Sequence, residues 1–315
     1  MRTIAVVDLG SNTIRLSVYR VDEGLNFERL FSQKEMAGLV NYISAGVLSP
    51  EGIERACTAL TDFQELLTLL HVREVHVFAT ASLRNIRNTD EAVETIRRRT
   101  GLFVDVLPGP VEAELGYYGA LRTLDLRSGA LFDIGGGSTE LVQVRRGRIL
   151  QGQSLPLGSL TLFNAYVSGV WPKEKELKAI REAARRALQG ADLPKKRVKR
   201  VIGVGGTARA VLKIANACLD RPEEERRLTP EQLHELTGIL TRRDQRARKL
   251  ILNACPDRLH TLLPGIVLMD TVCRRLCSEM LYISPFGVRE GYLCRRLLHT
   301  EETGRDRPEH GQGGA

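Results

Sequence analysis

The sequence predicts an α/β protein with two domains, because the same strand–turn–strand unit occurs twice. The stretches "AVVDLGSNTIRLSVY" (residues 5–19) and "ALFDIGGGSTELVQV" (residues 130–144) share one layout. In both, an apolar strand ends in Asp-x-Gly, small polar residues follow, and a second apolar strand comes next. Helices and further strands then follow each unit. A duplicated α/β domain explains these observations better than one long sheet does.

Length, charge and cysteine content are those of an ordinary globular protein. The 315 residues are enough for two sizeable cores. No apolar run reaches membrane-spanning length, and the N-terminus enters a strand pattern with no signal peptide, so we expect a cytoplasmic protein. The six cysteines include no Cys-x-x-Cys pair and indicate reduced thiols. The net charge of +8 suits a polyphosphorylated partner and is equally typical of solvated helix faces.

The first domain, residues 1–124, is predicted to run β-β-β-α-β-α-β-α. Ser49 caps a helix that Pro50 opens and that ends near residue 70. Asn88 caps a second helix, which Gly101 closes, and a third helix spans 110–122. The predicted strands are 3–9, 13–21, 27–36, 74–80 and 103–107.

The second domain, residues 125–300, begins with three strands and continues mainly in helices. The polar stretch "LRTLDLRSG" near 122–129 marks the boundary between the domains. The tail 301–315 is polar and Gly-rich, and we expect it to be disordered. The predicted strands are 129–134, 138–145, 148–154 and 200–204; the predicted helices are 158–168, 173–189, 206–218, 229–252 (broken), 257–280 and a last one from about 287.

The glycines of the two matched turns predict phosphate-binding loops. A tight turn that exposes several backbone N–H groups forms a concave anion site, and glycine permits unusual φ angles and close approach of a phosphate. Small polar side chains add neutral donors. The alternative is a pair of hairpins whose glycines only relieve crowding. The predicted substrate contacts are Gly10, Ser11 and Asn12 in the first turn, and Gly135, Gly136, Gly137, Ser138 and Thr139 in the second.

Carboxylates beside these turns predict a metal site. Asp8 and Asp133 cannot bind phosphate directly, because like charges repel. Their natural role there is to hold Mg²⁺ (or Mn²⁺), which takes oxygen ligands and keeps several waters. We assign Asp8, Asp133 and Glu140 to this site.

A third glycine turn, "VIGVGGTARAV" (residues 201–211), follows a strand and opens a helix. Helix N-termini attract anions, so Gly205, Gly206 and Thr207 are further candidates for substrate binding. The turn is not a dinucleotide fingerprint, since the G-x-G-x-x-G spacing fails.

Several motifs together resemble the exopolyphosphatase and guanosine pentaphosphate phosphohydrolase (Ppx/GppA) family, within the sugar kinase, Hsp70 and actin superfamily. They are "VVDLGSNTIRL", "FATASLRNIRN", "GPVEAELGYYGA", "FDIGGGSTELV", "PLGSLTL" and "GVREGYL", in order through residues 1–297. The resemblance implies two ribonuclease-H-like domains and an interdomain cleft that hydrolyses terminal phosphates with Mg²⁺. The chain resembles the short, two-domain members.

The resemblance also implies individual roles. The family places its catalytic base before an Ala in the helix at 110–122, and this position is Glu112 here. Val111 and Glu114 depart from the family pattern around the base. Arg84, which follows strand 74–80, matches a family arginine whose fork suits phosphate oxygens. Arg289 and Glu290 match a motif that we interpret as packing the last helix near the cleft.

One further departure is His260, which occupies a position where the family often shows Asp. It has no companion at ligand spacing, so we do not interpret it as a metal ligand.

Four functions are compatible with these residues. The first is a Mg²⁺-dependent phosphohydrolase that releases terminal orthophosphate from inorganic polyphosphate; the second is the same chemistry on guanosine pentaphosphate. The third is a non-catalytic sensor of either ligand, which the presence of Glu112 disfavours. The fourth is a kinase, disfavoured because no insertion that would hold a sugar is present. We expect no membrane and no specific nucleic acid as partner, and a homodimer is compatible with the sequence.

Overall fold

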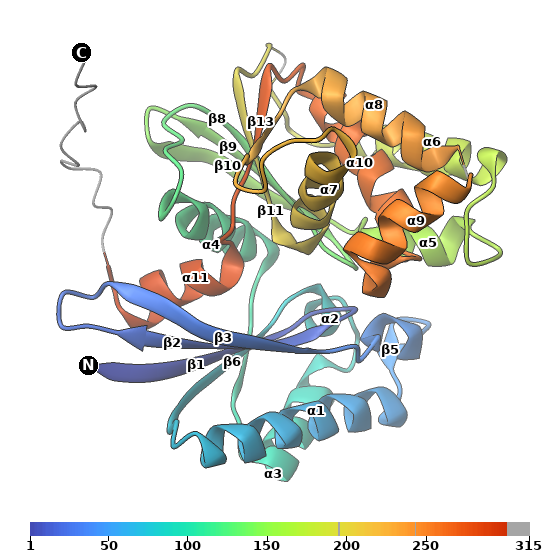
Figure 1. Ribbon diagram of the computed structural model, residues 1–315. Coiled ribbons are helices and arrows are strands. Elements are labelled where there is room, and N and C mark those ends of the chain that lie inside the picture. The colour runs from blue at the N-terminus through green and yellow to red at the C-terminus, as the bar shows by residue number, and fades with distance from the viewer. Residues whose placement is uncertain (195, 243, 301–315) are drawn as a thin grey trace, which may run out of the picture.

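The computed structural model describes residues 1–194, 196–242 and 244–300, and it consists of two α/β bodies stacked one on the other (Figure 1). Each body has one main sheet with helices against it. The predicted α/β class and the two-part organisation are therefore confirmed. The tail 301–315 lies outside the described residues. None of the helices described combines the length and the apolar character that a membrane span requires.

The first sheet has the strand order β3-β2-β1-β6-β7, in which β1 pairs antiparallel with β2 and parallel with β6. Its strands are β1 (Arg2–Leu9), β2 (Ile14–Val21), β3 (Phe27–Glu35), β6 (Glu74–Ala79) and β7 (Val104–Val106). Helices α1 (Pro50–Leu69) and α3 (Thr89–Thr100) cover one face. The short elements are η1 (Leu39–Tyr42), β4 (Ile43–Ser44), β5 (Val47–Leu48) and α2 (Ala81–Arg84).

Local signals set the helix ends of the first body, with one correction. The Ser49 hydroxyl accepts from the Gly52 N–H at 3.3 Å, so the predicted cap of α1 is confirmed. Gly101 closes α3 with a left-handed φ of 72°. Asn88 stands at the N-cap position of α3, but the prediction that its side chain caps the helix is wrong. Its amide instead exchanges two hydrogen bonds of 3.0 Å with the backbone of Leu48, which ties β5 to α3.

The second sheet repeats the connectivity of the first, with the order β10-β9-β8-β11-β13-β12. Here β8 pairs antiparallel with β9 and parallel with β11, as β1 does with β2 and β6. The strands are β8 (Gly129–Ile134), β9 (Thr139–Arg145), β10 (Arg148–Leu155), β11 (Arg200–Val204), β12 (Arg227–Leu228) and β13 (Met280–Ile283). The helices of the second body share one apolar core with this sheet. They are α5 (Ser159–Tyr166), α6 (Glu174–Gln189), α7 (Gly205–Cys218), α8 (Pro230–Thr241), α9 (Gln245–Ala254) and α10 (Leu262–Arg275).

The prediction of one helix over 257–280 is wrong, and strand β13, which follows, was not predicted. The structure has a short 3-10 turn, η2 (Pro256–Arg258), then α10, and then strand β13 between β11 and the edge strand β12. Cys277 adopts a left-handed φ of 45° between helix and strand. The apolar run of β13 is only four residues long, and such a short run does not show its period.

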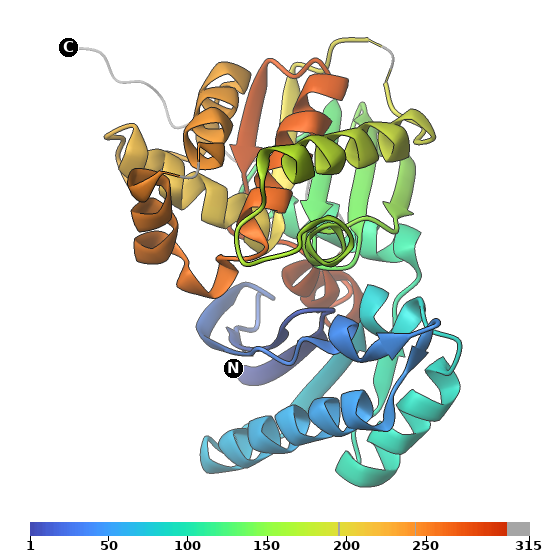
Figure 2. The same cartoon turned by 90° about the vertical axis from the view of Figure 1, so that its right-hand side faces the viewer.

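Two helices lie between the sheets and cross the order of the sequence. Helix α4 (Gly109–Leu121) packs Ala113 and Tyr117 on the second sheet. Helix α11 (Val288–Tyr292), continued by η3 (Leu293–Leu297), packs Tyr292 on the first sheet. Both views place α11 between the two bodies (Figures 1 and 2). Because each helix lies on the sheet of the other half of the chain, the boundary near residue 124 stays a prediction.

The two crossing helices touch through glycines. A Cβ atom at Gly119 of α4 would collide with the carbonyl oxygen of Gly287, and one at Gly291 of α11 would collide with that of Leu115. Backbone atoms cannot rotate away as side-chain ends can. Only glycine therefore permits this approach of α4 and α11.

Replacing Gly119 with Ala should destabilise the protein by about 1–3 kcal/mol, because the added methyl overpacks a backbone contact. Gly238→Ala, in α8, is the matched control, since nothing lies within 4 Å of a Cβ there. That change should stabilise the protein by about 0.5–1 kcal/mol through helix propensity. Urea unfolding measures both; a neutral Gly119→Ala would show that the helices separate readily.

Candidate active site

The two glycine turns have the same geometry. In the first, the Gly10 N–H donates to the Thr13 carbonyl at 3.2 Å; in the second, the Gly135 N–H donates to the Ser138 carbonyl at 3.0 Å. Each turn therefore joins its strands through four residues. The duplication inferred from the sequence extends to the hydrogen bonds of the loops.

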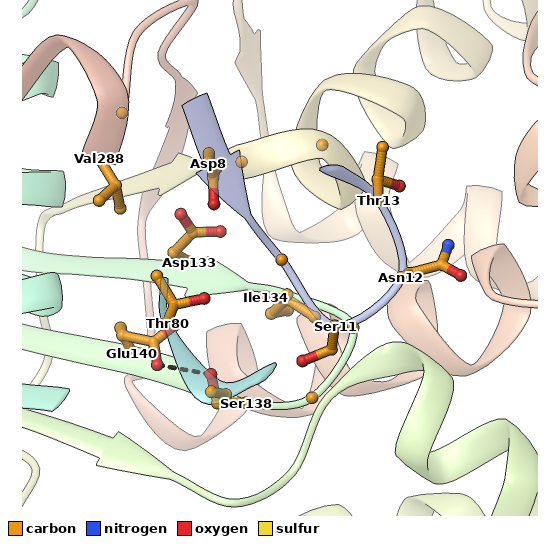
Figure 3. Close-up of a pocket in the computed structure, with 18 of the residues that line it drawn as sticks. Asp8, Ser11, Asn12, Thr13, Thr80, Asp133, Ile134, Ser138, Glu140 and Val288 are labelled. Carbon is orange, nitrogen blue, oxygen red and sulfur yellow. Dashed lines mark hydrogen bonds between the residues drawn. The ribbon is translucent and has the colours of Figure 1, made fainter. Parts of the chain in front are cut away.

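Strand alternation aims an aspartate from each sheet into the space between the bodies. In β1, Ala5 and Val7 face α1 and α3, whereas Ile4 and Val6 face α11. Asp8 continues the second set, because side chains two apart share a face. In β8, Leu131 faces α4, and Asp133 lies on the same face. The two carboxylates consequently face each other (Figure 3).

The turns of the two bodies are in direct contact, and this explains the glycines. A Cβ atom at Gly137 would strike the Ser11 hydroxyl, and one at Gly136 would lie 3.3 Å from the Cβ of Asn12. The expectation that unusual φ angles require these glycines is wrong, because none of residues 135–137 has a positive φ. Close approach of the second turn to the first is the physical reason.

A polar cavity of about 150 Å³ lies where the turns meet (Figure 3). The third glycine turn closes another side of it, and Gly205 has the left-handed φ of 82° that a side chain would disfavour. The predicted residues that line the cavity are Asp8, Gly10, Ser11, Asn12, Glu112, Asp133, Gly135, Gly136, Gly137, Ser138, Glu140, Gly205 and Gly206.

Two predicted donors are placed differently. The Thr139 hydroxyl donates to the Leu157 carbonyl at 2.6 Å, and the Thr207 hydroxyl donates to the Ile134 carbonyl at 2.8 Å. Both side chains are buried outside the cavity lining. Each hydroxyl already donates its one proton to a backbone carbonyl, so neither can donate to a substrate phosphate. These threonines instead hold the turns in place.

Arg84 lies behind the cavity and holds carboxylates. Its guanidinium donates to Glu112 Oε2 at 2.6 Å, to the Leu107 carbonyl at 3.0 Å and to the Ser154 hydroxyl at 3.1 Å. It is also 3.7 Å from Glu140 Oε1. The contact between Arg84 and phosphate stays a prediction; the observed role is to fix Glu112.

Glu112 has the surroundings expected of a general base. It is 7% exposed at the start of α4 and lines the cavity, whereas Glu114 does not. Burial and the neighbouring Glu140 raise the pKa of Glu112 well above its usual value, and Arg84 opposes that rise. A carboxyl whose pKa is raised towards neutrality takes up a proton more readily than an ordinary one.

The two facing aspartates fit a magnesium site. Burial raises the pKa of Asp133 to about 6, and Asp8 adds to the shift by repulsion. Burial also raises the pKa of Asp8. A cation between them would relieve this repulsion. Among the described residues, no three His, Cys, Asp or Glu side chains form a group that could hold a metal by themselves. Magnesium commonly uses one or two carboxylates and completes its shell with water and substrate phosphates.

The Glu140 carboxylate is held in place by hydrogen bonds from two serine hydroxyls. It is 2% exposed, and its Oε1 accepts from the Ser138 and Ser154 hydroxyls, both at 2.7 Å. Burial and then Asp133 raise its pKa to about 7. Its contribution to the metal site stays a prediction.

Four arginines complete the cavity lining, and the sequence analysis assigned none of them to substrate. They are Arg15, Arg209, Arg258 and Arg289. Burial lowers the pKa of Arg15 and of Arg209 to about 10, so both remain charged at neutral pH. The position of Arg15 in the cavity could have been predicted from the sequence, because Arg15 lies directly opposite Asp8 in the hairpin register. The other three come from α7, η2 and α11, and no local pattern connects them.

The departures from the family pattern lie outside the cavity lining. Val111 packs beside the apolar cluster under α11. His260 meets the ring of Phe163 edge-on, with centroids 5.4 Å apart. Neither residue contributes to the cavity formed by the carboxylates and the glycine turns.

Comparison with known proteins gives one consistent family. The model of the Ppx/GppA phosphatase family matches residues 17–300. An uncharacterized protein of Streptomyces coelicolor is 32% identical over 308 residues, covering 94% of this chain and 90% of the relative. Exopolyphosphatase 1 of Mycobacterium leprae is 24% identical, covering 93% and 89%. The crystal structure of an exopolyphosphatase from Cytophaga hutchinsonii superposes with a TM-score of 0.81 at 22% identity, covering 95% and 99%, and this supports the fold.

Glu140→Gln should stabilise the metal-free protein at pH 8. The folded-state pKa of about 7 exceeds the ordinary 4.5, so between these values the folded state binds more protons and the free energy of unfolding falls as pH rises. Gln keeps the accepting oxygen and removes the charge. In EDTA, we expect a melting temperature higher by about 2 °C or more at pH 8 and little change at pH 4.5. The exposed Glu235→Gln is the control; a lower melting temperature for Glu140→Gln at pH 8 would contradict the cause given.

Proposed function

Because the chain belongs to the Ppx/GppA phosphatase family, we propose that it is a phosphohydrolase that releases terminal orthophosphate from inorganic polyphosphate. One observation carries the proposal. Two glycine turns, one from each body, meet in a cavity that also holds Glu112 and two facing aspartates. The name of the mycobacterial relative, an exopolyphosphatase, supports the choice of substrate.

The cavity suits the end of a phosphate chain. Backbone groups and the Ser11 hydroxyl supply neutral donors, and four arginines supply positive charge. Arginine forks bind phosphate oxygens in pairs and hold the terminal group in one orientation. The net charge of +8 favours a long polyanion, since more phosphates can contact more basic side chains.

Asp8 and Asp133 would hold Mg²⁺ or Mn²⁺ against the phosphates, in the proposed scheme with Glu140. When bound, the metal would neutralise charge on the phosphoryl oxygens. Glu112 would take the proton of the attacking water. Arg84 would keep the Glu112 carboxylate oriented, through the 2.6 Å hydrogen bond already present. Hydrolysis then needs no covalent enzyme intermediate.

Guanosine pentaphosphate is the alternative substrate, because it ends in the same phosphoanhydride group. Phosphate release from polyphosphate and from guanosine pentaphosphate, measured side by side with and without Mg²⁺, separates the two. Absence of turnover together with tight binding would instead favour a non-catalytic sensor.

Glu112→Gln should lower kcat by ~10²–10⁴-fold and leave substrate binding nearly unchanged, because the amide keeps the shape and cannot take up a proton. Glu114→Gln is the matched control, two residues along the same helix and outside the cavity lining. Steady-state phosphate release measures both. A Glu112→Gln enzyme with more than about a third of wild-type kcat would move the base elsewhere.

Removal of divalent metal with EDTA should abolish phosphate release, and Mg²⁺ or Mn²⁺ should restore it, because oxygen ligands of this kind hold hard cations. Asp133→Asn should raise the metal concentration for half-maximal activity by about tenfold or more, which corresponds to roughly 1.4 kcal/mol of binding. The exposed Asp125→Asn serves as the control. Full activity in chelator would exclude the metal from the scheme.

A further inference from the structure

We propose that Arg289 of α11 binds the phosphoryl group at the end of the substrate, and that Glu290 and Tyr19 position it for this role. The inference rests on the proposed function. It assigns to Arg289 a task that the sequence analysis interpreted as helix packing. In this proposal, Glu290 keeps the packing role.

Arg289 lines the cavity and has a hydrogen-bond donor without a partner among the described residues. Its side chain is 11% exposed, and Nη1 lies 3.6 Å from Asp8 Oδ2. Its Nε is buried and makes no hydrogen bond with any described residue. A buried donor without a partner is costly, so such a group indicates an unmet contact. Arg289 lines the cavity, where a ligand can supply that contact.

Glu290 has the opposite character. It is 1% exposed, and its carboxylate accepts from the Tyr19 hydroxyl at 2.7 Å and from the Gly287 N–H at 2.9 Å. Arg29 lies 3.6 Å away. The carboxylate is thus fully occupied by neighbours and does not line the cavity. It fastens the start of α11 to strand β2.

The attachment of α11 fixes Arg289 relative to Asp8. Tyr292 stacks on Phe78 of β6, with ring centroids 4.8 Å apart. Val288, at the start of the helix, borders the same space as Asp8 and Asp133 (Figure 3). Arg289 therefore moves with the first sheet, although it comes from the end of the described chain.

This position suits charge that develops during phosphoryl transfer. Negative charge spreads over the three equatorial oxygens of the transferred group, and positioned cations stabilise it. Arg289 approaches from the side of Asp8, whereas Arg209 and Arg258 come from the second body. The terminal phosphate would be held by arginines of both bodies. A purely structural Arg289 would serve only to neutralise Asp8.

Binding measured without turnover separates these roles. In the Glu112→Gln background with Mg²⁺, tripolyphosphate is titrated by calorimetry into proteins with Arg289, Arg289→Gln or Arg289→Lys. We expect Arg289→Gln to weaken Kd by about tenfold or more and Arg289→Lys by less, since Lys keeps a charge and loses the fork. Arg296→Gln, exposed at the end of the same segment, is the control. Unchanged Kd for Arg289→Gln would overturn the proposal.

Chemical rescue gives a second readout in the otherwise wild-type enzyme. Arg289→Ala should lose about 10²-fold in kcat/KM, and free guanidinium at low millimolar concentration should restore part of it. Rescue requires a folded protein with an empty guanidinium site. A folded Arg289→Ala enzyme that loses activity without any rescue contradicts the assignment.

Tyr19→Phe tests the positioning. Loss of the hydroxyl frees the Glu290 carboxylate, so Kd for tripolyphosphate should rise by about three- to tenfold and kcat should fall as well. Unchanged Kd and kcat in Tyr19→Phe would overturn the positioning role of Tyr19 and Glu290. If wild-type enzyme releases no phosphate from either substrate while Arg289 still governs tripolyphosphate binding, the proposed function fails and the inference about Arg289 stands.

Discussion

The burial of opposed charges in one small cavity is the constraint on which the rest of the molecule depends. The two sheets and helix α4 bring together four carboxylates, and burial raises the pKa of each: Asp8, Asp133, Glu112 and Glu140. Such an arrangement costs folding free energy, because charged groups lose hydration. The arginines that line the cavity offset part of the cost. In the proposed function, a metal ion and a phosphate chain would offset the remainder, so the charges that weaken the fold would favour binding of the ligand.

The helices between the sheets turn this constraint into a defined geometry. Glu112 stands at the start of α4, which rests on the second sheet, and Arg289 stands at the start of α11, which rests on the first. The two helices touch where Gly119 meets Gly287. Each sheet thereby carries a cavity-lining side chain from the other half of the chain. A shift of either sheet would change the distance between Glu112 and Arg289, and close packing at the glycines limits such a shift.

Local features of the site could be predicted from the sequence, whereas contacts between distant segments could not. Both hairpins, their aspartates and their glycines were predictable, because alternation and turn chemistry act over a few residues. The unusual φ angles expected at Gly136 and Gly137 were wrong, and the contact between the bodies that these glycines permit cannot be seen in one segment. Arg258 and Arg289 reach the cavity only through tertiary packing. Strand β13 was not predicted, because four apolar residues show no period of their own.

The duplicated hairpins share a backbone but differ in the charge beside their aspartates. Asp8 pairs with Arg15 across the first hairpin, and Asp133 pairs with Glu140 at the equivalent place in the second. The backbone is repeated, yet the partner of the aspartate is a cation in one body and a carboxylate in the other. The second hairpin therefore concentrates negative charge and is better suited to hold a metal. The first carries the half-buried Arg15 and is better suited to hold phosphate. Closing the two bodies on one ligand would bring metal and phosphate contacts together, which neither hairpin offers alone.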